Sequence, residues 1–449
     1  MPISYLELMN RKKQLEKGNS KLINAWASYD WANSVYPLVI SSTVFPIYYS
    51  TISQDISTIE FFGFNFKNTA LISFVTAMAF VVVAFYSPFL SGIADYIGNK
   101  KRFMKIFVYL GSISCVGLYF FELESIYMGM FFYFLALIGF WASLVFYNSY
   151  LPDIAHPEQL DFASARGFSM GYVGSILLLI VNLTMVLKPD WFGITGTPSE
   201  SSLKAMKYSF ITVGIWWALF SQYAFYHLPR GNSEVKVTKD ILWNGFLELK
   251  KVWNQLEELP ILKKFLPAFF VYSTALQTVI LIATYFGEEE IMWTNSEQKT
   301  IGLIVSILLI QIVAIFGAYA TALASKKFGN IFTLVVVNFI WAVLCVFAFF
   351  IKTPMEFYVA AAGVGMVMGG IQSLSRSTYS KLIPNTKDTT SFFSFYDVTE
   401  KVGIIIGMAI FGIIDQITGS MRNAILFFIV LFSLGAFLLS RIPNCRTEK

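Results

Sequence analysis

Twelve long apolar segments limit the folds that this sequence can adopt. A helix needs about 20 mostly apolar residues to cross the hydrocarbon core of a bilayer. The segments expected to cross are 27–49, 69–91, 103–121, 126–147, 167–187, 208–227, 265–286, 300–324, 331–351, 356–375, 392–414 and 423–442. Only 14% of the residues are charged, whereas a soluble domain averages about 25%. We therefore predict an all-α integral membrane protein of about twelve transmembrane helices.

The basic residues indicate how this protein lies in the membrane. With an even number of spans, both termini lie on one side. Of the 33 Lys and Arg residues, 25 fall on that side, seven fall on the opposite side, and Lys401 lies inside a span. Cytoplasmic loops carry the excess of Lys and Arg. We expect a multi-pass protein of the cell membrane (inner or plasma) with both termini in the cytoplasm and the lipid bilayer as a partner.

The longest loop on the basic side divides the chain near its middle. It separates an N-terminal half at 1–228, with a short cytoplasmic N-terminus and six spans, from a C-terminal half of six spans at 265–449. In the linker, 229–264, apolar residues recur at helical spacing before Pro260. This spacing predicts an amphipathic helix on the membrane surface or under the bundle, which we interpret as a tether between the halves.

The loop after the second span combines glycine, aspartate and basic residues. It reads Gly92-Ile-Ala-Asp95-Tyr-Ile-Gly98-Asn-Lys100-Lys101-Arg102. This resembles the G-x-x-x-D-x-x-G-x-[RK]-[RK] signature of the major facilitator superfamily, in which the loop latches the two halves in one conformation. Gly92 permits close helix approach, Gly98 permits a tight turn, and Asp95 can cap a helix end. The resemblance implies the major facilitator fold and gating roles for Gly92, Asp95, Gly98, Lys101 and Arg102.

Four further motifs are spread over the chain. They are AWASYDWANS at 25–34, FYNSYLPDI at 146–154, GGIQSLSRS at 369–377 and FFSFYDVTEK at 392–401. Together they resemble the autophagy-related vacuolar effluxer-like family of major facilitators. Fungal members of that family are implicated in exporting amino acids from the vacuole, so the resemblance implies amino-acid transport. One departure is that the family's seventh span often opens Y-x-D-G, whereas this chain reads YSTA at 272–275.

Asp30 is an acidic residue inside the first predicted span. A charge near a helix centre costs about 2.5–3.5 kcal/mol on insertion scales, so it needs a compensating role. Two roles stay open: Asp30 binds a substrate ammonium group or relays a proton, or it forms a fixed pair with a cation of another helix. Tyr29, Asn33 and Tyr36 lie near it at helical spacing. We expect these four residues to line one cavity and to contact the substrate or coupling ion.

Other polar residues in the spans are candidates for the same roles. Glu400 and Lys401 lie in the eleventh span, and adjacent residues do not face each other on a helix. We therefore expect each to find another partner, either for substrate or ion coupling or in a structural charge network. Gln277 and Gln372 either hold helices together or contact the ligand.

Three charged residues near the ends of spans are candidates for gating. Asp153 and Arg166 flank the loop between the fourth and fifth spans, and we expect them to pair as a gate or brace. Arg376 follows the polar end of the tenth span and completes the gating set.

These features favour one class of function. We predict a secondary transporter that moves a small polar solute by alternating access, coupled to protons or sodium. Two alternatives stay open: export of a lipid or apolar compound, which the many aromatic residues would suit, and an integral membrane enzyme acting on lipid-linked substrates. The sequence has no Walker loop, no spacing typical of a metal site and no basic patch for nucleic acid. We expect no cofactor, no metal and no enzymatic activity.

Overall fold

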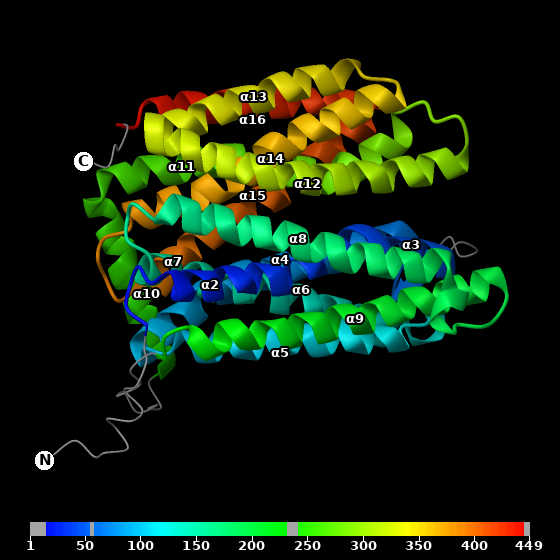
Figure 1. Cartoon of the computed structure of the whole chain (residues 1–449), viewed down its shortest axis with the longest axis horizontal. Helices are drawn as coiled ribbons and strands as arrows, with labels where there is room; N and C mark the ends of the chain where they lie inside the picture. The colour runs from blue at the N-terminus through cyan, green and yellow to red at the C-terminus, as the bar shows by residue number, and fades with distance from the viewer. Residues whose placement is uncertain (1–14, 54–57, 231–240, 444–449) are drawn as a thin grey trace, which may run out of the picture.

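The computed structural model is a bundle of long helices that run side by side (Figure 1). It describes residues 15–53, 58–230 and 241–443. The first half contains α2 (Ser20–Asn33), the π-helix η1 (Tyr36–Val44), α3 (Phe45–Ile52), β1 (Thr58–Phe61), β2 (Phe64–Lys67), α4 (Asn68–Ile97), α5 (Lys100–Gly117), the 3-10 helices η2 (Leu118–Phe120) and η3 (Leu123–Ser125), α6 (Ile126–Asn148), α7 (Leu151–Ile154), α8 (Leu160–Leu187), the 3-10 helix η4 (Pro189–Phe192) and α9 (Pro198–His227). The rest contains α10 (Ile241–Glu258), α11 (Pro260–Glu289), α12 (Ser296–Phe328), α13 (Asn330–Phe350), α14 (Pro354–Leu382), α15 (Thr389–Thr418) and α16 (Met421–Ser440).

The helices confirm the predicted membrane-spanning architecture. Within the described residues, eleven helical segments are long and apolar enough to cross a membrane. The sixth predicted span falls on α9, which is a 30-residue helix packed against α2, α5 and α8. Several helices run past the predicted apolar limits: α14 reaches Leu382 and α15 begins at Thr389. Helical hydrogen bonding needs no apolar side chain, so polar residues extend these helices beyond the apolar segments.

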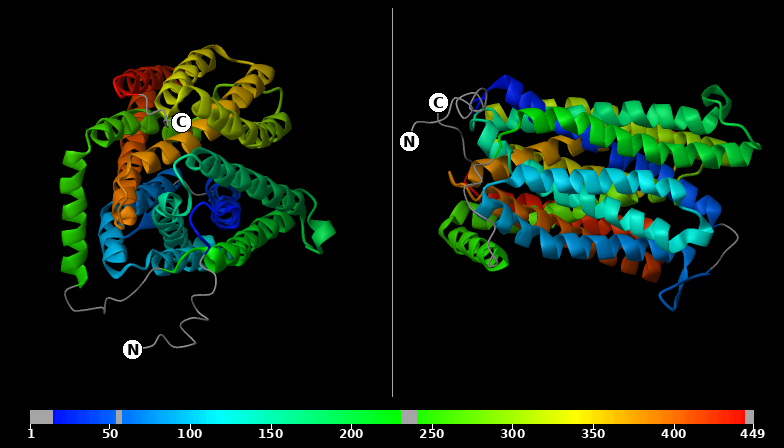
Figure 2. Two further views of the ribbon diagram at one scale, coloured as in Figure 1. Left: turned by 60° about the vertical axis from the view of Figure 1, so that its left-hand side comes forward. Right: turned by 90° about the horizontal axis from the view of Figure 1, so that it is seen from below.

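Two hydrophobic cores organise the bundle into two groups of helices (Figure 2). One cluster joins buried residues between Leu22 and Leu228, and the other is built mainly from residues between Val252 and Ile442. The groups meet where α4 packs on α15 and where α8 packs on α12. We call the end of the bundle that carries α7 and α10, at the left in Figure 1, the linker end.

A helix lies at the predicted place in the linker: α10 ends just before Pro260. It packs mainly against α4 and forms a strut beside the bundle (Figure 2). The crossing point is a pair of glycines: a Cβ atom on Gly92 would clash with the backbone oxygen of Gly245. Close approach at Gly92 is thus confirmed, and its partner is the linker helix.

The first span changes its winding inside the membrane. α2 is followed at once by a nine-residue π-helix, Tyr36–Val44, and then by α3. Pro37 and Pro46 lack backbone N–H groups, and Thr43 donates its hydroxyl hydrogen to the carbonyl oxygen of Leu38 at 2.7 Å. The π winding thus coincides with the two prolines of this span and with the side-chain bond of Thr43. π-Helical turns are frequent at functional sites.

Candidate functional site

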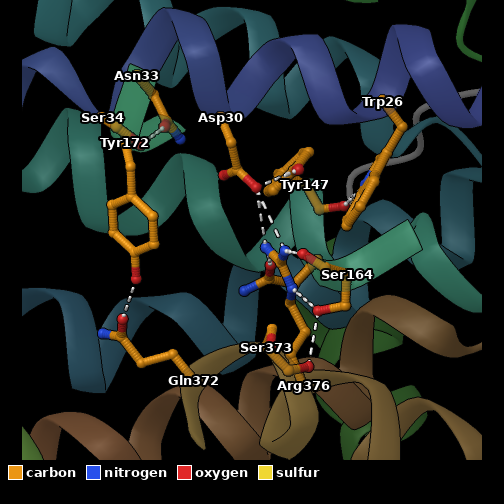
Figure 3. A network of polar contacts seen from close by, with 11 residues as sticks. Trp26, Asp30, Asn33, Ser34, Tyr147, Ser164, Tyr172, Gln372, Ser373 and Arg376 are labelled. Carbon is orange, nitrogen blue, oxygen red and sulfur yellow. Dashed lines mark hydrogen bonds and ion pairs between the residues drawn. The ribbon is translucent and has the colours of Figure 1, made fainter. Parts of the chain in front are cut away.

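A buried ion pair joins the two halves of the bundle (Figure 3). Asp30 comes from α2 and Arg376 from α14, and their side chains are 7% and 4% exposed. Both terminal nitrogens of Arg376 lie 3.3 Å from Oδ2 of Asp30. Tyr147 of α6 donates its hydroxyl hydrogen to the same oxygen at 2.7 Å. The pair is the fixed-cation alternative considered for Asp30, and its partner lies in the opposite half.

The remaining donors of Arg376 are also used within the first half. Its Nε donates to the hydroxyl oxygen of Ser164 at 2.9 Å, and one terminal nitrogen donates to the Ser164 carbonyl oxygen at 3.0 Å. The other terminal nitrogen donates to the side-chain oxygen of Asn148 at 3.2 Å. A guanidinium group has five donors in a rigid plane, so one side chain can bind three helices at once.

Aromatic rings surround the same guanidinium group. Its central carbon lies 4.2 Å from the ring centre of Phe168 and 4.8 Å from that of Trp26. Trp26 in turn stacks on Tyr147. Cation–π contacts strengthen when water is excluded, so the rings stabilise the charge that the hydrogen bonds position.

Gly167 allows these groups to approach. A Cβ atom at this position would clash with the carboxylate of Asp30 and would lie 3.0 Å from Arg376. Glycine is therefore the residue that lets α8 pack against both members of the pair.

The expectation that Tyr29, Asn33 and Tyr36 line one cavity with Asp30 is wrong. Tyr29 donates its hydroxyl hydrogen to Ser143 at 2.8 Å, and Tyr36 packs against Phe140, both inside the first half. Asn33 is buried and accepts a hydrogen bond from its neighbour Ser34. Successive helical residues differ by about 100°, and that rotation turns Tyr29 and Tyr36 into the core while Asp30 faces Arg376.

Two more hydrogen bonds cross between the halves beside this pair. Tyr172 donates its hydroxyl hydrogen to the side-chain oxygen of Gln372 at 3.0 Å, and Ser164 donates to the carbonyl oxygen of Ser373 at 2.7 Å (Figure 3). Gln372 therefore holds helices together in this structure. The bonds extend the contact between α8 and α14 towards the middle of the bundle.

The loop of the superfamily signature contacts the opposite half at the linker end. Asp95 accepts hydrogen bonds from the backbone N–H groups of Ser391 at 2.6 Å and Thr390 at 3.3 Å, in the first turn of α15. These N–H groups have no partner within their own helix. Gly98 turns the chain with a φ of 70°. Asp95 thus caps a helix of the other half.

The basic residues of this loop divide between different roles. Lys101 is buried and donates to the carbonyl oxygen of Leu228 at 2.7 Å, within its own half. Arg102 has an exposed side chain. Lys100, which the sequence analysis did not select, donates to Thr389 of α15 at 2.9 Å. Because three basic residues follow one another at 100–102, the sequence does not indicate which of them faces the partner helix.

The predicted pair of Asp153 and Arg166 is not formed. Asp153 lies 2.6 Å from the ammonium group of Lys100. Arg166 is exposed on α8 and makes no salt bridge with the described residues. Asp153 lies within the short helix α7, whereas Arg166 lies almost two turns into α8 at an exposed position, so the two side chains do not meet.

A second cross-half cluster surrounds Asp161 at the start of α8, and the sequence analysis did not place it in the site. The partners come from the ends of three helices of the second half. They are Lys381 at 2.6 Å, Ser377 at 2.7 Å, Asn330 at 2.8 Å and Ser325 at 3.0 Å. An acidic residue in the first turn of a helix is usually explained by its interaction with the helix dipole. The sequence therefore contains no sign of the long-range contacts of Asp161.

Three charged residues cluster inside α15. The ammonium group of Lys401 lies 2.7 Å from Asp397 and 2.8 Å from Glu400. Gln277 of α11 donates its amide hydrogen to Glu400 at 2.7 Å. Each residue has another partner as expected, Gln277 for Glu400 and Asp397 for Lys401. The expectation that the two would not contact each other is wrong, because their long side chains bend to meet although their Cβ atoms diverge. Gln277 is part of this cluster.

The segment YSTA at 272–275, where the resemblance implies a carboxylate at the third position, lies beside α15. The third residue is Thr274, and its hydroxyl donates to the carbonyl oxygen of Phe270 in its own helix at 2.7 Å. A Cβ atom on Gly403 would lie 2.7 Å from that hydroxyl. The Thr274 hydroxyl therefore has a hydrogen-bond partner in its own helix, and it lies where α11 and α15 pack closely.

A salt bridge outside the spans joins the linker helix to the second half at the linker end. Lys251 of α10 lies 2.8 Å from Asp388, the residue before α15, and 3.1 Å from Glu248. The hydrogen bond to Asp388 raises the pKa of the Lys251 ammonium group above its usual value. The linker helix is therefore tied to α15 as well as to α4.

Comparison with known proteins agrees with this arrangement. The family described as vacuole effluxer Atg22 like matches residues 18–449. The chain belongs to this family. A protein of Bacillus subtilis named as the uncharacterized MFS-type transporter YxiO is 30% identical over 425 residues, which are 95% of each chain. Autophagy-related protein 22 of Yarrowia lipolytica is 26% identical over 64% of this chain and 51% of that protein.

Solved structures show the same fold. The Escherichia coli fucose:proton symporter FucP superimposes with a TM-score of 0.67 and 14% identity, covering 96% of this chain and 98% of that one. This likeness shows the fold. The family match and the relative of 30% identity show that the chain is a multi-pass membrane transporter of the major facilitator superfamily, as its motifs predicted, and not an enzyme.

Proposed function

We propose that this protein is a secondary active transporter of a small polar solute, with amino acids as the favoured class, and that Asp30 and Arg376 close its path at the linker end. The observation that carries the proposal is the buried pair between α2 and α14, 3.3 Å apart. An ion pair between two halves can break and re-form when the halves rotate, which is what alternating access requires. The description of the family, vacuole effluxer Atg22 like, favours export.

The distribution of contacts supports a closed linker end. The cross-half hydrogen bonds of Asp95, Asp161, Arg376 and Tyr172 all lie between the linker end and the middle of the bundle. If the excess of Lys and Arg lies inside, the linker end faces the cytoplasm. The structure then represents a state closed to the cytoplasm, with both termini on that side of a plasma or inner membrane.

Several finer roles belong to this proposal. The two halves correspond to 1–228 and 265–449 and the linker to 229–264, a division supported by the two hydrophobic clusters. Asp95 and its loop latch the closed state. Protons or sodium supply the driving force.

The charges between the halves favour a polar cargo over a lipid. The rings closest to Arg376 are occupied by contacts with its guanidinium group, and Tyr29 and Tyr36 pack inside the first half. The abundance of aromatic residues, which would suit an apolar cargo, is therefore used for packing and for holding a cation. A lipid path would also leave buried ionic groups facing hydrocarbon, which is costly.

Transport in proteoliposomes tests the proposal. We expect exchange of one or more labelled amino acids across the membrane, and accumulation when a proton gradient is imposed. Asp95→Ala is expected to slow transport without reducing membrane insertion, because it removes the caps on Thr390 and Ser391. Asp190→Ala, at an exposed site far from the linker end, is the matched control.

Two results would contradict it. If no labelled amino acid exchanges at all, the substrate class is wrong. If Asp95→Ala transports at the full rate at equal expression, the latch role is wrong.

A further inference from the structure

The cluster inside α15 carries an unbalanced charge. Lys401 is fully buried, Asp397 is 6% exposed and Glu400 is 15% exposed at their side chains. With all three groups ionised, two negative charges face one positive charge. A net charge buried within a membrane-spanning helix is costly, so the cluster needs one more positive charge.

The hydrogen bonds show which carboxylate of the cluster has an oxygen without a partner among the described residues. Both oxygens of Glu400 are engaged, one by Gln277 and the other by Lys401. Asp397 uses Oδ1 to accept from Lys401 at 2.7 Å. Its other oxygen, Oδ2, is buried and has no hydrogen-bond partner among the described residues. The unpaired carboxylate oxygen is therefore on Asp397 and not on Glu400.

The burial of Oδ2 of Asp397 limits which cation can neutralise it. Oδ2 of Asp397 exposes almost no surface, so a solute ammonium group has no room beside it. A sodium ion would need several oxygen ligands around it, as hard cations do, and the oxygens of Glu400 are already engaged. A proton needs neither space nor further ligands.

The cluster also lies where the halves meet. The ammonium group of Lys401 lies 3.9 Å from the ring centre of Trp141 on α6, in the opposite half. At a rise of 1.5 Å per residue, Asp397 lies about 12 Å along the axis of α15 from the first residue of that helix. Rotation of the halves would remove the ring from Lys401 and change how well the ammonium group is stabilised. The charge balance at Asp397 would then change with the conformation.

Other titratable groups near the cluster do not supply the missing charge. Tyr272 on α11, Tyr379 on α14 and Tyr396 on α15 are neutral phenols packed nearby. Arg376 on α14 is occupied by Asp30. Trp141 on α6 does not titrate, and no charged residue of α4 contacts the cluster in the described part of the chain.

We propose that Asp397 is the site at which this transporter takes up and releases its coupled proton, with Lys401 and Glu400 as positioning residues that set its charge. The coupling role of Asp397 rests on the proposed transport function, whereas its protonation does not depend on that function. The proton binds Oδ2 of Asp397 in one conformation and leaves it in another. Asp30 is then the gate and not the proton carrier.

Infrared difference spectra of the purified full-length protein at different pH values test the site without any substrate. We expect a carbonyl-stretch band from a buried protonated carboxyl group that changes with pH. Asp397→Asn should abolish this band, and Lys401→Met should strengthen it, because the carboxylates then lose their counter-charge. Asp415→Asn, on the same helix, is the matched control and should leave the band unchanged.

The stability of the variants keeps the test informative. Asp397→Asn removes one unbalanced charge and should melt at or above the temperature of the unmodified protein. A lower melting temperature would indicate a purely structural carboxylate and overturn the inference. So would a band that survives Asp397→Asn, or one that responds to sodium at constant pH and not to pH.

Transport then connects the site to function. In proteoliposomes with labelled amino acids, Asp397→Asn should keep solute counterflow and lose accumulation driven by a pH gradient. Loss of both activities with an intact fold would overturn the coupling role. If the unmodified protein shows no counterflow, the proposed function fails while the infrared result still decides the protonation site.

Discussion

Arg376 is the residue on which the contacts of the candidate site converge. It binds an acid, a hydroxyl, an amide and a backbone carbonyl from three helices of the opposite half, inside a group of aromatic rings. Lys could not replace it, because its ammonium group lacks the planar fork of donors. Burial of this kind makes each partner dependent on the other: a buried charge left without its partner typically costs about 3–5 kcal/mol.

A double-mutant cycle at this pair measures that dependence. We expect Asp30→Asn to lower the melting temperature and to destabilise the protein by about 3–5 kcal/mol, because Arg376 is left buried and unpaired. Adding Arg376→Gln should restore part of the loss, since neither charge then remains. Asp190→Asn serves as the control at an exposed position. Strictly additive effects of the two substitutions would show that the side chains do not interact.

At the scale of the elements, two glycines set how the linker helix meets the bundle. A Cβ atom on Gly245 would lie 2.6 Å from the side chain of Ile93, and one on Gly92 would meet the backbone of α10. Backbone atoms cannot rotate aside as a side chain can. The linker helix is therefore docked on α4 by close approach and tied to α15 by Lys251 and Asp388.

Substitution of these glycines tests the docking. We expect Gly92→Ala to push α10 off α4, lower the melting temperature and speed proteolysis of the linker. Gly412→Ala is the matched control, because Gly412 lies in α15 with nothing within 4 Å of a Cβ atom. Alanine favours a helix by up to about 1 kcal/mol over glycine, so the control should be neutral or slightly stabilising. Equal behaviour of the two variants would contradict the close contact.

The elements were largely predictable from sequence and their partners were not. Apolar length gives the spans, and helical spacing gives α10, because both depend on neighbouring residues. The contact of Asp30 with Arg376 joins positions far apart in the chain, and no local period encodes it. The rotation of α2 decided whether Tyr29 or Trp26 accompanies Asp30, and a single sequence does not fix that rotation. Asp161 was missed for the same reason.

At the scale of the whole molecule, the two halves exchange matching contacts at the linker end. Asp95 near the end of α4 caps the start of α15, while Ser325 near the end of α12 reaches Asp161 at the start of α8. The two contacts thus join helix ends of the two halves, with the acid on α4 in one and on α8 in the other. A rotation that opens this end must break both contacts together, so they act as one gate with the pair of Asp30 and Arg376.

The side of the membrane that this gate faces is open to direct measurement. The excess of Lys and Arg predicts that the linker end lies in the cytoplasm. Single cysteines at Lys250, exposed on α10, and at Ser199, exposed at the opposite end, report the two sides. The described native cysteines, Cys115 and Cys345, are buried, and Cys445 is replaced by serine in the background.

In intact cells, a membrane-impermeant maleimide should label the cysteine at Ser199 and not the one at Lys250. After the cells are opened, both should react, which controls for an unreactive thiol. Labelling of Lys250→Cys from outside would invert the topology. The gate of Asp95, Asp161 and Arg376 would then close the external side. The measurement therefore decides on which side of the membrane this gate closes the path, and from which side Asp397 is shut off in the state described here.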